Sequence, residues 1–176
     1  MNAVVIGAAK PGYAEAITRK LIKNGFKVIG TYDTEFEENA TKLSKEFSSE
    51  KLTLKSLDLS SRNDLKSFVD DIVDPIDAFV FAQFYFDMEN PDDFNHEIWD
   101  KSIAINLTAP NYLIHELKNK MNAGSSIVIL TSTEGFRGSY GASAYAATKA
   151  AIHNLVKTLA NNLGKRGIRI NALPAG

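Results

Sequence analysis

The chain has 176 residues, of which 44% are hydrophobic and 23% are charged, as in an ordinary globular domain. Lys and Arg (20) balance Asp and Glu (21), so no basic surplus indicates a nucleic-acid partner. The absence of Cys excludes disulfides, Cys-ligated zinc and thiol catalysis, and we expect no metal site. Neither a secretory signal nor a membrane-spanning apolar run is found. We therefore expect one domain over residues 1–176 of a cytoplasmic protein, without a membrane or nucleic-acid partner.

Short β-rich runs alternate with longer amphipathic runs along the chain. The predicted strands cover residues 3–6, 27–32, 52–58, 76–81, 126–131 and 168–173. The predicted helices cover residues 13–24, 36–47, 61–72 (capped by Ser60 or Ser61), 98–121 and 143–164. The first strand, AVVI, is apolar on both faces, as in a parallel sheet buried between helices. The alternation predicts an α/β fold: three layers, with a doubly wound parallel sheet between helices on both faces.

A glycine-bearing turn follows the first strand and leads into the first helix. It reads Gly7-Ala8-Ala9-Lys10-Pro11-Gly12-Tyr13-Ala14. Backbone N–H groups at such a helix start can bind a pyrophosphate, with support from the helix dipole. The alternative is a plain connection between a strand and a helix, because the glycines are few.

Asp33 ends the second strand, 21 residues beyond Gly12. An acid at this distance can accept hydrogen bonds from an adenosine ribose and would repel a 2′-phosphate. The neighbouring acids Glu35, Glu37 and Glu38 favour NAD in the same way, whereas Lys10 could bind a phosphate. The alternative is that Asp33 is a solvated acid or a helix cap.

Tyr145 and Lys149 are four residues apart on the predicted helix 143–164, so their side chains share a face. A neighbouring ammonium lowers the pKa of a phenol, and such a phenol can exchange a proton with a carbonyl or alcohol oxygen. Ser132 follows the fifth strand, 13 residues before Tyr145, where its hydroxyl could bind the same oxygen or cap a turn. Asn106 lies among apolar residues, where a satisfied structural amide is the common alternative.

Together these residues resemble the short-chain dehydrogenase/reductase family. The similarity extends over Ser126–Gly176 almost throughout and includes Gly7–Leu21, Leu57–Leu59 and Ile105–Leu107. The order and spacing of Asn106, Ser132, Tyr145 and Lys149 are its most specific part. The resemblance implies a Rossmann-type fold and an NAD(P)-dependent oxidoreductase that interconverts an alcohol and a ketone or aldehyde.

The resemblance also implies a role for each site residue. Tyr145 would be the general acid/base, Ser132 would orient the substrate oxygen, and Lys149 would bind the nicotinamide ribose and lower the pKa of Tyr145. Asn106 would support a water-linked proton relay through Lys149. The remaining cofactor contacts would come from Gly7, Ala9, Lys10, Gly12, Tyr13, Asp33, Asp58, Leu59, Ala82, Gln83, Pro174 and Gly176.

The sequence departs from the family pattern at several positions. Ile6 replaces the usual Thr, Pro11 lengthens the glycine turn by one residue, and Ala14 replaces its third Gly. Phe81-Ala82-Gln83-Phe84 replaces the Asn-Asn-Ala-Gly segment that borders the cofactor. The family also continues past the position of Gly176, so we expect a substrate loop and a final strand to be missing here. These departures motivate the alternative of a non-catalytic nucleotide-binding or regulatory protein.

Two further expectations concern ligands and partners. NAD is the expected cofactor, with NADP as the other possibility, and the substrate is a small alcohol or ketone. An apolar substrate pocket or part of the core could be formed by the aromatic residues Phe84, Tyr85, Phe86, Phe136 and Tyr140. The resemblance implies a homodimer or homotetramer assembled through the helices around 98–121 and 143–164.

Overall fold

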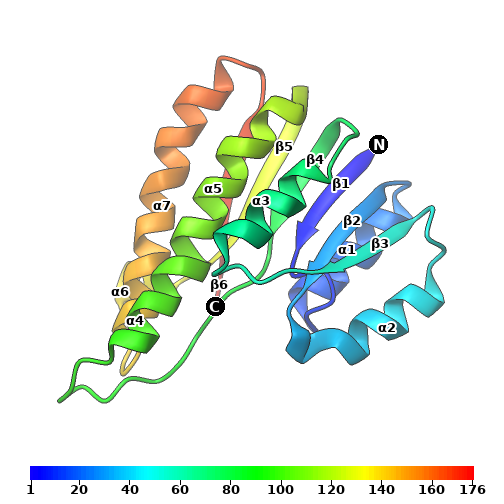
Figure 1. Ribbon diagram of the computed structural model, residues 1–176. Helices are drawn as coiled ribbons and strands as arrows, with labels where there is room; N and C mark the ends of the chain where they lie inside the picture. Colours follow the sequence, from blue (N-terminus) through cyan, green and yellow to red (C-terminus); the bar gives the residue numbers. More distant parts are fainter.

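The computed structural model describes residues 1–176 and contains a six-stranded parallel sheet in the order β3-β2-β1-β4-β5-β6 (Figure 1). Since all strands run in the same direction, their carboxyl ends meet at one edge, the lower edge in Figure 1. The strands are β1 (Asn2–Ile6), β2 (Lys27–Tyr32), β3 (Leu52–Ser56), β4 (Ile76–Phe81), β5 (Met121–Ser132) and β6 (Arg169–Ala175).

Helices connect successive strands. They are α1 (Tyr13–Lys23), α2 (Glu37–Glu46), α3 (Arg62–Asp70), α4 (His96–Ile103), α5 (Ala109–Leu117), α6 (Glu134–Arg137) and α7 (Ser143–Gly164). The shorter 3₁₀ segments are η1 (Thr34–Phe36) and η3 (Lys118–Lys120), and the π-helical turn η2 (Ala104–Thr108) joins α4 to α5. No helix combines the length and apolarity needed to cross a bilayer.

Two hydrophobic clusters fill the spaces above and below the sheet. Helices α3, α5 and α7 cover one face, and α1 and α2 cover the other (Figure 1). Successive side chains of a strand point to opposite faces, so β1 serves both clusters. Val4 and Ile6 enter the larger cluster of 25 residues, whereas Ala3 and Val5 enter the smaller one of 13. The predicted α/β fold, a doubly wound parallel sheet with helices on both faces, is confirmed.

Several element boundaries differ from the prediction. The helix predicted to run to residue 121 ends at Leu117, because Met121 pairs with Ile76 and begins a longer β5. Strand β3 ends at Ser56, so the segment that follows it is free to turn toward α3. Strand β6 continues to Ala175 because its backbone pairs with β5 as far as Ser132. Ser61, one of the two candidate caps, accepts the amide hydrogen of Asp64 at the start of α3.

Candidate active site

The glycine turn lies at the carboxyl edge of the sheet, between β1 and α1. Gly7 has φ +84°, and a Cβ there would lie 2.8 Å from Gln83 Oε1 and 3.1 Å from the Gln83 Cα. Its amide donates to Thr31 Oγ1 at 3.1 Å. Gly12 caps α1 with φ +97°, and no atom lies within 4 Å of the position of its absent Cβ. The turn therefore packs tightly against Gln83, just after β4, and leaves open space beside the first amides of α1.

The other predicted residues of this turn have different surroundings. Ala9 is fully buried, and its carbonyl accepts a hydrogen bond from Asn39 Nδ2 at 2.7 Å. Tyr13 is exposed at the start of α1. Lys10 turns toward β4: its Nζ donates to the Phe84 carbonyl at 3.3 Å and lies 3.5 Å from the centroid of the Phe84 ring.

Ser132 and Tyr145 are both buried, although their elements differ. Ser132 is the last residue of β5, and Tyr145 lies in the first turn of α7. The Ser132 hydroxyl oxygen accepts the amide hydrogen of Glu134 at 3.2 Å, so its own proton remains available for donation. Burial raises the pKa of the Tyr145 phenol, the Ser132 hydroxyl lowers it, and the charge of Glu134 raises it.

Lys149 lies one helical turn after Tyr145 and is 3% exposed. Its Nζ is 5.2 Å from the centroid of the Tyr145 ring and 5.6 Å from that of Phe84. Burial lowers the pKa of Lys149 to about 8, and the positive charge of Lys10 acts in the same direction. The net pKa of Tyr145 is raised, because burial outweighs the effect of the Ser132 hydroxyl. That Lys149 lowers the pKa of Tyr145 stays a prediction.

Asn106 is 1% exposed and lies within the π-helical turn η2. Its Oδ1 accepts the amide hydrogen of Tyr85 at 2.8 Å, and its Nδ2 donates to the Tyr85 carbonyl at 2.9 Å and to Thr148 Oγ1 at 3.3 Å. The side chain therefore joins the segment after β4 to η2 and α7. Both polar atoms of the Asn106 side chain have hydrogen-bond partners, as expected for a structural amide. Asn106 also lies beside α7, the helix that carries Lys149.

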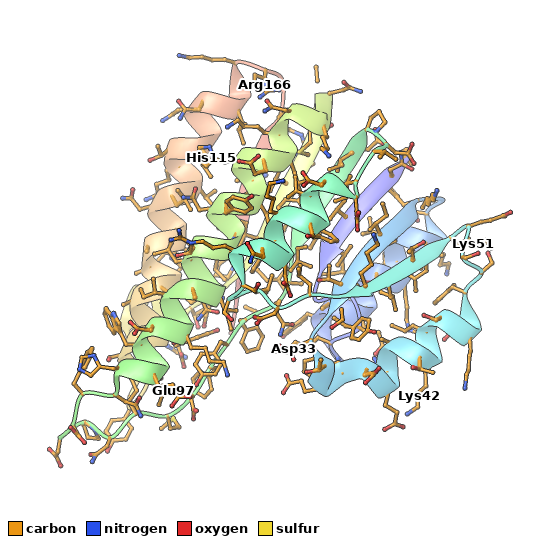
Figure 2. The ribbon with its side chains drawn as sticks, viewed as in Figure 1. Asp33, Lys42, Lys51, Glu97, His115 and Arg166 are labelled. Carbon is orange, nitrogen blue, oxygen red and sulfur yellow. The ribbon has the colours of Figure 1, made fainter.

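Asp33 lies after β2, beside the start of α2, and Figure 2 labels it at the lower edge of the sheet. Its carboxylate accepts the amide hydrogen of Glu35 and caps η1, so the cap interpretation is correct. It also borders a cavity of about 450 Å³. The cavity is lined by Asp33, Thr34, Ser56, Leu57, Asp58, Ser60, Asp64, Lys101 and Ile105.

Asp58 and Leu59, both predicted to contact the cofactor, have different surroundings. Asp58 borders the cavity beside Asp33, and its Oδ1 accepts from both the amide and the hydroxyl of Ser60. Leu59 is 6% exposed and belongs to the larger hydrophobic cluster, so its side chain is a core side chain.

Two further pairs of predicted cofactor contacts lie at the ends of neighbouring strands. Ala82 and Gln83 follow β4 and are buried, and Gln83 Oε1 has no hydrogen-bond partner. Pro174 pairs with Thr131 at the end of β6, and Gly176 follows the strand end that pairs with Ser132. The parallel sheet therefore brings the carboxyl ends of β1, β4, β5 and β6 to one edge.

Of the five aromatic residues considered for a pocket, two contact Tyr145. The ring centroid of Phe86 lies 5.1 Å from that of Tyr145 and the centroid of Phe84 lies 6.1 Å away, both in edge-to-face geometry. Phe136 instead stacks on His153 at 4.0 Å, and Tyr140 is 89% exposed. Sequence reasoning missed that Phe84 lies close to both Lys10 and Lys149. No local pattern encodes a contact between the segment after β4 and the glycine turn.

Comparison with known proteins shows the family of this chain. The family profile described as Enoyl-(Acyl carrier protein) reductase matches residues 7–176. This chain belongs to the short-chain dehydrogenase/reductase family. Within the family, it is 30% identical over 182 residues to Enoyl-[acyl-carrier-protein] reductase [NADH] FabI of Bacillus cereus, a match covering 98% of this chain and 71% of the relative.

Other family members match over different lengths. Dehydrogenase/reductase SDR family member 4 of Homo sapiens is 40% identical over 86 residues, which is 48% of this chain and 31% of that protein. The chain thus spans less than a third of that relative and about 70% of others. The structure of BdcA in complex with NADPH has 27% identity and a TM-score of 0.90, covering 99% of this chain and 70% of that one. A metagenomic blue fluorescent protein in complex with NADPH has 27% identity and a TM-score of 0.92, covering 99% and 73%.

Proposed function

We propose that the protein interconverts an alcohol and a ketone or aldehyde by hydride transfer with a nicotinamide dinucleotide. The observation that carries the proposal is the convergence of Ser132, Tyr145 and Lys149, all buried, at the strand-end edge that also holds the glycine turn. Ligands of open α/β sheets bind at this edge. A relative named as an NADH-dependent enoyl reductase, and solved relatives described with bound NADPH, support hydride transfer with a nicotinamide dinucleotide.

The residues present fit such a cofactor. The open space beside Gly12 and the first amides of α1 suits a pyrophosphate, together with the backbone from Gly7 to Tyr13. The unpartnered Gln83 Oε1 and the Lys149 ammonium suit the hydroxyl groups of a ribose. Ala82, Pro174 and Gly176 would border the nicotinamide end.

In this proposal the protein handles the proton. The nicotinamide supplies or accepts the hydride when it is bound. Tyr145 donates its phenolic proton to the carbonyl oxygen as that oxygen gains charge, and takes a proton back when an alcohol is oxidised. Ser132 donates a hydrogen bond to the same oxygen, because its hydroxyl proton is not committed to Glu134. The Lys149 charge stabilises the phenolate, and Asn106 holds η2 beside α7 for a water-linked relay.

The acidic cavity beside Asp33 favours NAD over NADP. Three carboxylates, those of Asp33, Asp58 and Asp64, face one cation, Lys101, around the cavity. They can accept hydrogen bonds from ribose hydroxyls and would repel a 2′-phosphate. Lys10, which could otherwise attract that phosphate, instead contacts Phe84. NADH is therefore the proposed cofactor, although the relatives include proteins described with NADPH.

A non-catalytic nucleotide-binding protein is the second candidate, and one observation favours it. The Phe84 ring lies within 5.6 Å of both Lys10 Nζ and Lys149 Nζ, in a segment that borders the cofactor in the family. A bulky side chain at this position could leave space for a nucleotide but none for a substrate beside it. Carbonyl-dependent oxidation of NADH separates the two candidates.

The test combines fluorescence titration with NADH and NADPH and a carbonyl screen followed at 340 nm. We expect NADH to bind at micromolar concentration and at least ten times tighter than NADPH. Asp33→Ser should reduce this preference about tenfold, because it removes a charge that repels the 2′-phosphate. Glu50→Ser, which removes an exposed acid before β3, at the opposite end of that strand from the cavity, is the matched control and should keep the preference. Tighter binding of NADPH to the unaltered protein would contradict the assignment of NAD.

We propose a single domain over residues 1–176, because each face of the one sheet carries its own hydrophobic cluster. We also propose a homodimer or homotetramer through α5 and α7, with a small alcohol or ketone as the substrate. We also propose a cytoplasmic location, in keeping with the expectation from the sequence.

A further inference from the structure

The segment between β4 and α4 crosses the start of α7. Glu89 lies within this segment and is half-buried. Its amide donates to the carbonyl of Gly141 at 2.6 Å. Its Oε2 accepts the amide hydrogen of Ala144, 55 residues away in the sequence, at 3.1 Å. One residue thus binds the turn before α7 and the first turn of the helix itself.

Helix α7 has no side-chain cap of its own. The residue before it is Ala142, which cannot accept a hydrogen bond through its side chain. The first amides of a helix need acceptors, and a carboxylate there also interacts favourably with the helix dipole. Glu89 supplies the acceptor from another segment of the chain. This contact is the only side-chain cap on the helix that carries Tyr145 and Lys149.

The same segment also packs on Tyr145. Phe84 and Phe86 lie edge-on to its ring. Met88 contacts Gly141 so closely that a Cβ at Gly141 would lie 2.8 Å from the Met88 Cε. The position of the phenol therefore depends on the segment and on the start of α7 together. Glu89 joins these two parts by hydrogen bonds to both sides of the helix start.

We propose that Glu89 is a positioning residue: its carboxylate caps α7 and fixes the β4–α4 segment on it, so that Tyr145 keeps its place beside Ser132. The inference rests on the proposed function only where it speaks of turnover. The cap itself is a property of the fold. Loss of the carboxylate should free the first turn of α7 and slow proton transfer. The glycine turn should stay intact, because it contacts Gln83 and Phe84 at the start of the segment and not Glu89.

The test compares Glu89→Ala, Glu89→Gln and the control Asp92→Ala in the full chain. Asp92 is an exposed acid of the same segment. The first readout is hydrogen exchange of the Ala144 and Ala146 amides, which donate to Glu89 and to the Ala142 carbonyl, and it needs no substrate. We expect exchange about tenfold faster in Glu89→Ala, the effect of a lost cap. Glu89→Gln should remain within about threefold of the unaltered protein, because its amide oxygen can still accept.

The second readout is kcat and KM with NADH and the carbonyl compound turned over fastest in the screen. We expect kcat to fall about tenfold in Glu89→Ala with the KM for NADH within about twofold, and Glu89→Gln to restore most of kcat. Unchanged amide exchange in Glu89→Ala would overturn the cap. Faster exchange with unchanged kcat would overturn the positioning role. If the unaltered protein shows no turnover, the proposed function fails, whereas the exchange measurement still decides the cap.

Discussion

We expect Lys149 to set the upper pH limit of activity at the candidate active site. Its pKa is lowered to about 8, so at pH 7 roughly nine in ten molecules carry the ammonium charge. That fraction falls as the pH rises through 8, and the phenolate of Tyr145 then loses its positive neighbour. The Tyr145 pKa is raised by burial, so Tyr145 itself stays protonated over this range. We therefore expect kcat/KM for carbonyl reduction to decline above a pH of about 8.

Variants of Lys10 test the origin of this limit. The charge of Lys10 is the second cause of the lowered Lys149 pKa, after burial. Lys10→Gln removes that charge and should move the alkaline limb of the kcat/KM profile to higher pH. Lys10→Arg keeps the charge and should leave the limb in place. A limb that moves equally in both variants, or that moves to lower pH in Lys10→Gln, would contradict this account.

At the level of the element, the turn between β1 and α1 depends on the close approach of Gly7 to β4. A Cβ at Gly7 would collide with the Gln83 side chain and approach its backbone, whereas a Cβ at Gly25 would meet nothing within 4 Å. The two glycines share the same φ of +84°, so Gly25→Ala is a matched control for backbone strain. The difference between the two variants isolates the steric contact with β4.

We expect Gly25→Ala to lower the free energy of unfolding by about 1 kcal/mol, through backbone strain alone. Gly7→Ala should lower it by a further 1–3 kcal/mol or so, because the end of β4 must shift. Gly7→Ala should also weaken NADH binding at least tenfold, since the shift displaces Gln83. Urea unfolding and fluorescence titration measure these effects. Equal losses in both variants would show that the contact with Gln83 is unimportant.

The elements were predictable from the sequence where a local pattern specifies them. The apolar run of β1 and the periodicity of α7 give both elements close to their observed bounds. The longer β5 was not predictable, because Met121 joins it only through pairing with Ile76, far away in the sequence. The short α6 carries no buried residue and so has no apolar periodicity to reveal it.

At the scale of the whole molecule, the parallel sheet explains why distant residues form one site. Ser132 ends β5, Tyr145 starts α7, and the glycine turn follows β1, so all lie where strands end. Sequence spacing and family resemblance were sufficient to predict this grouping. They could not predict how the β4–α4 segment fills the site, because the contacts of Phe84 with Lys10 and of Glu89 with Ala144 join segments 74 and 55 residues apart. Those contacts exist only once the sheet order is established.

Turnover by Tyr145→Phe, with NADH and the carbonyl compound turned over fastest in the screen, tests the central claim most directly. The substitution removes only the phenolic hydroxyl and keeps the ring that packs against Phe84 and Phe86. We predict that kcat falls at least 100-fold, as expected for the loss of a general acid, while the Kd for NADH changes less than threefold. A Tyr145→Phe variant that oxidises NADH at the rate of the unaltered protein would contradict the claim that Tyr145 transfers the proton.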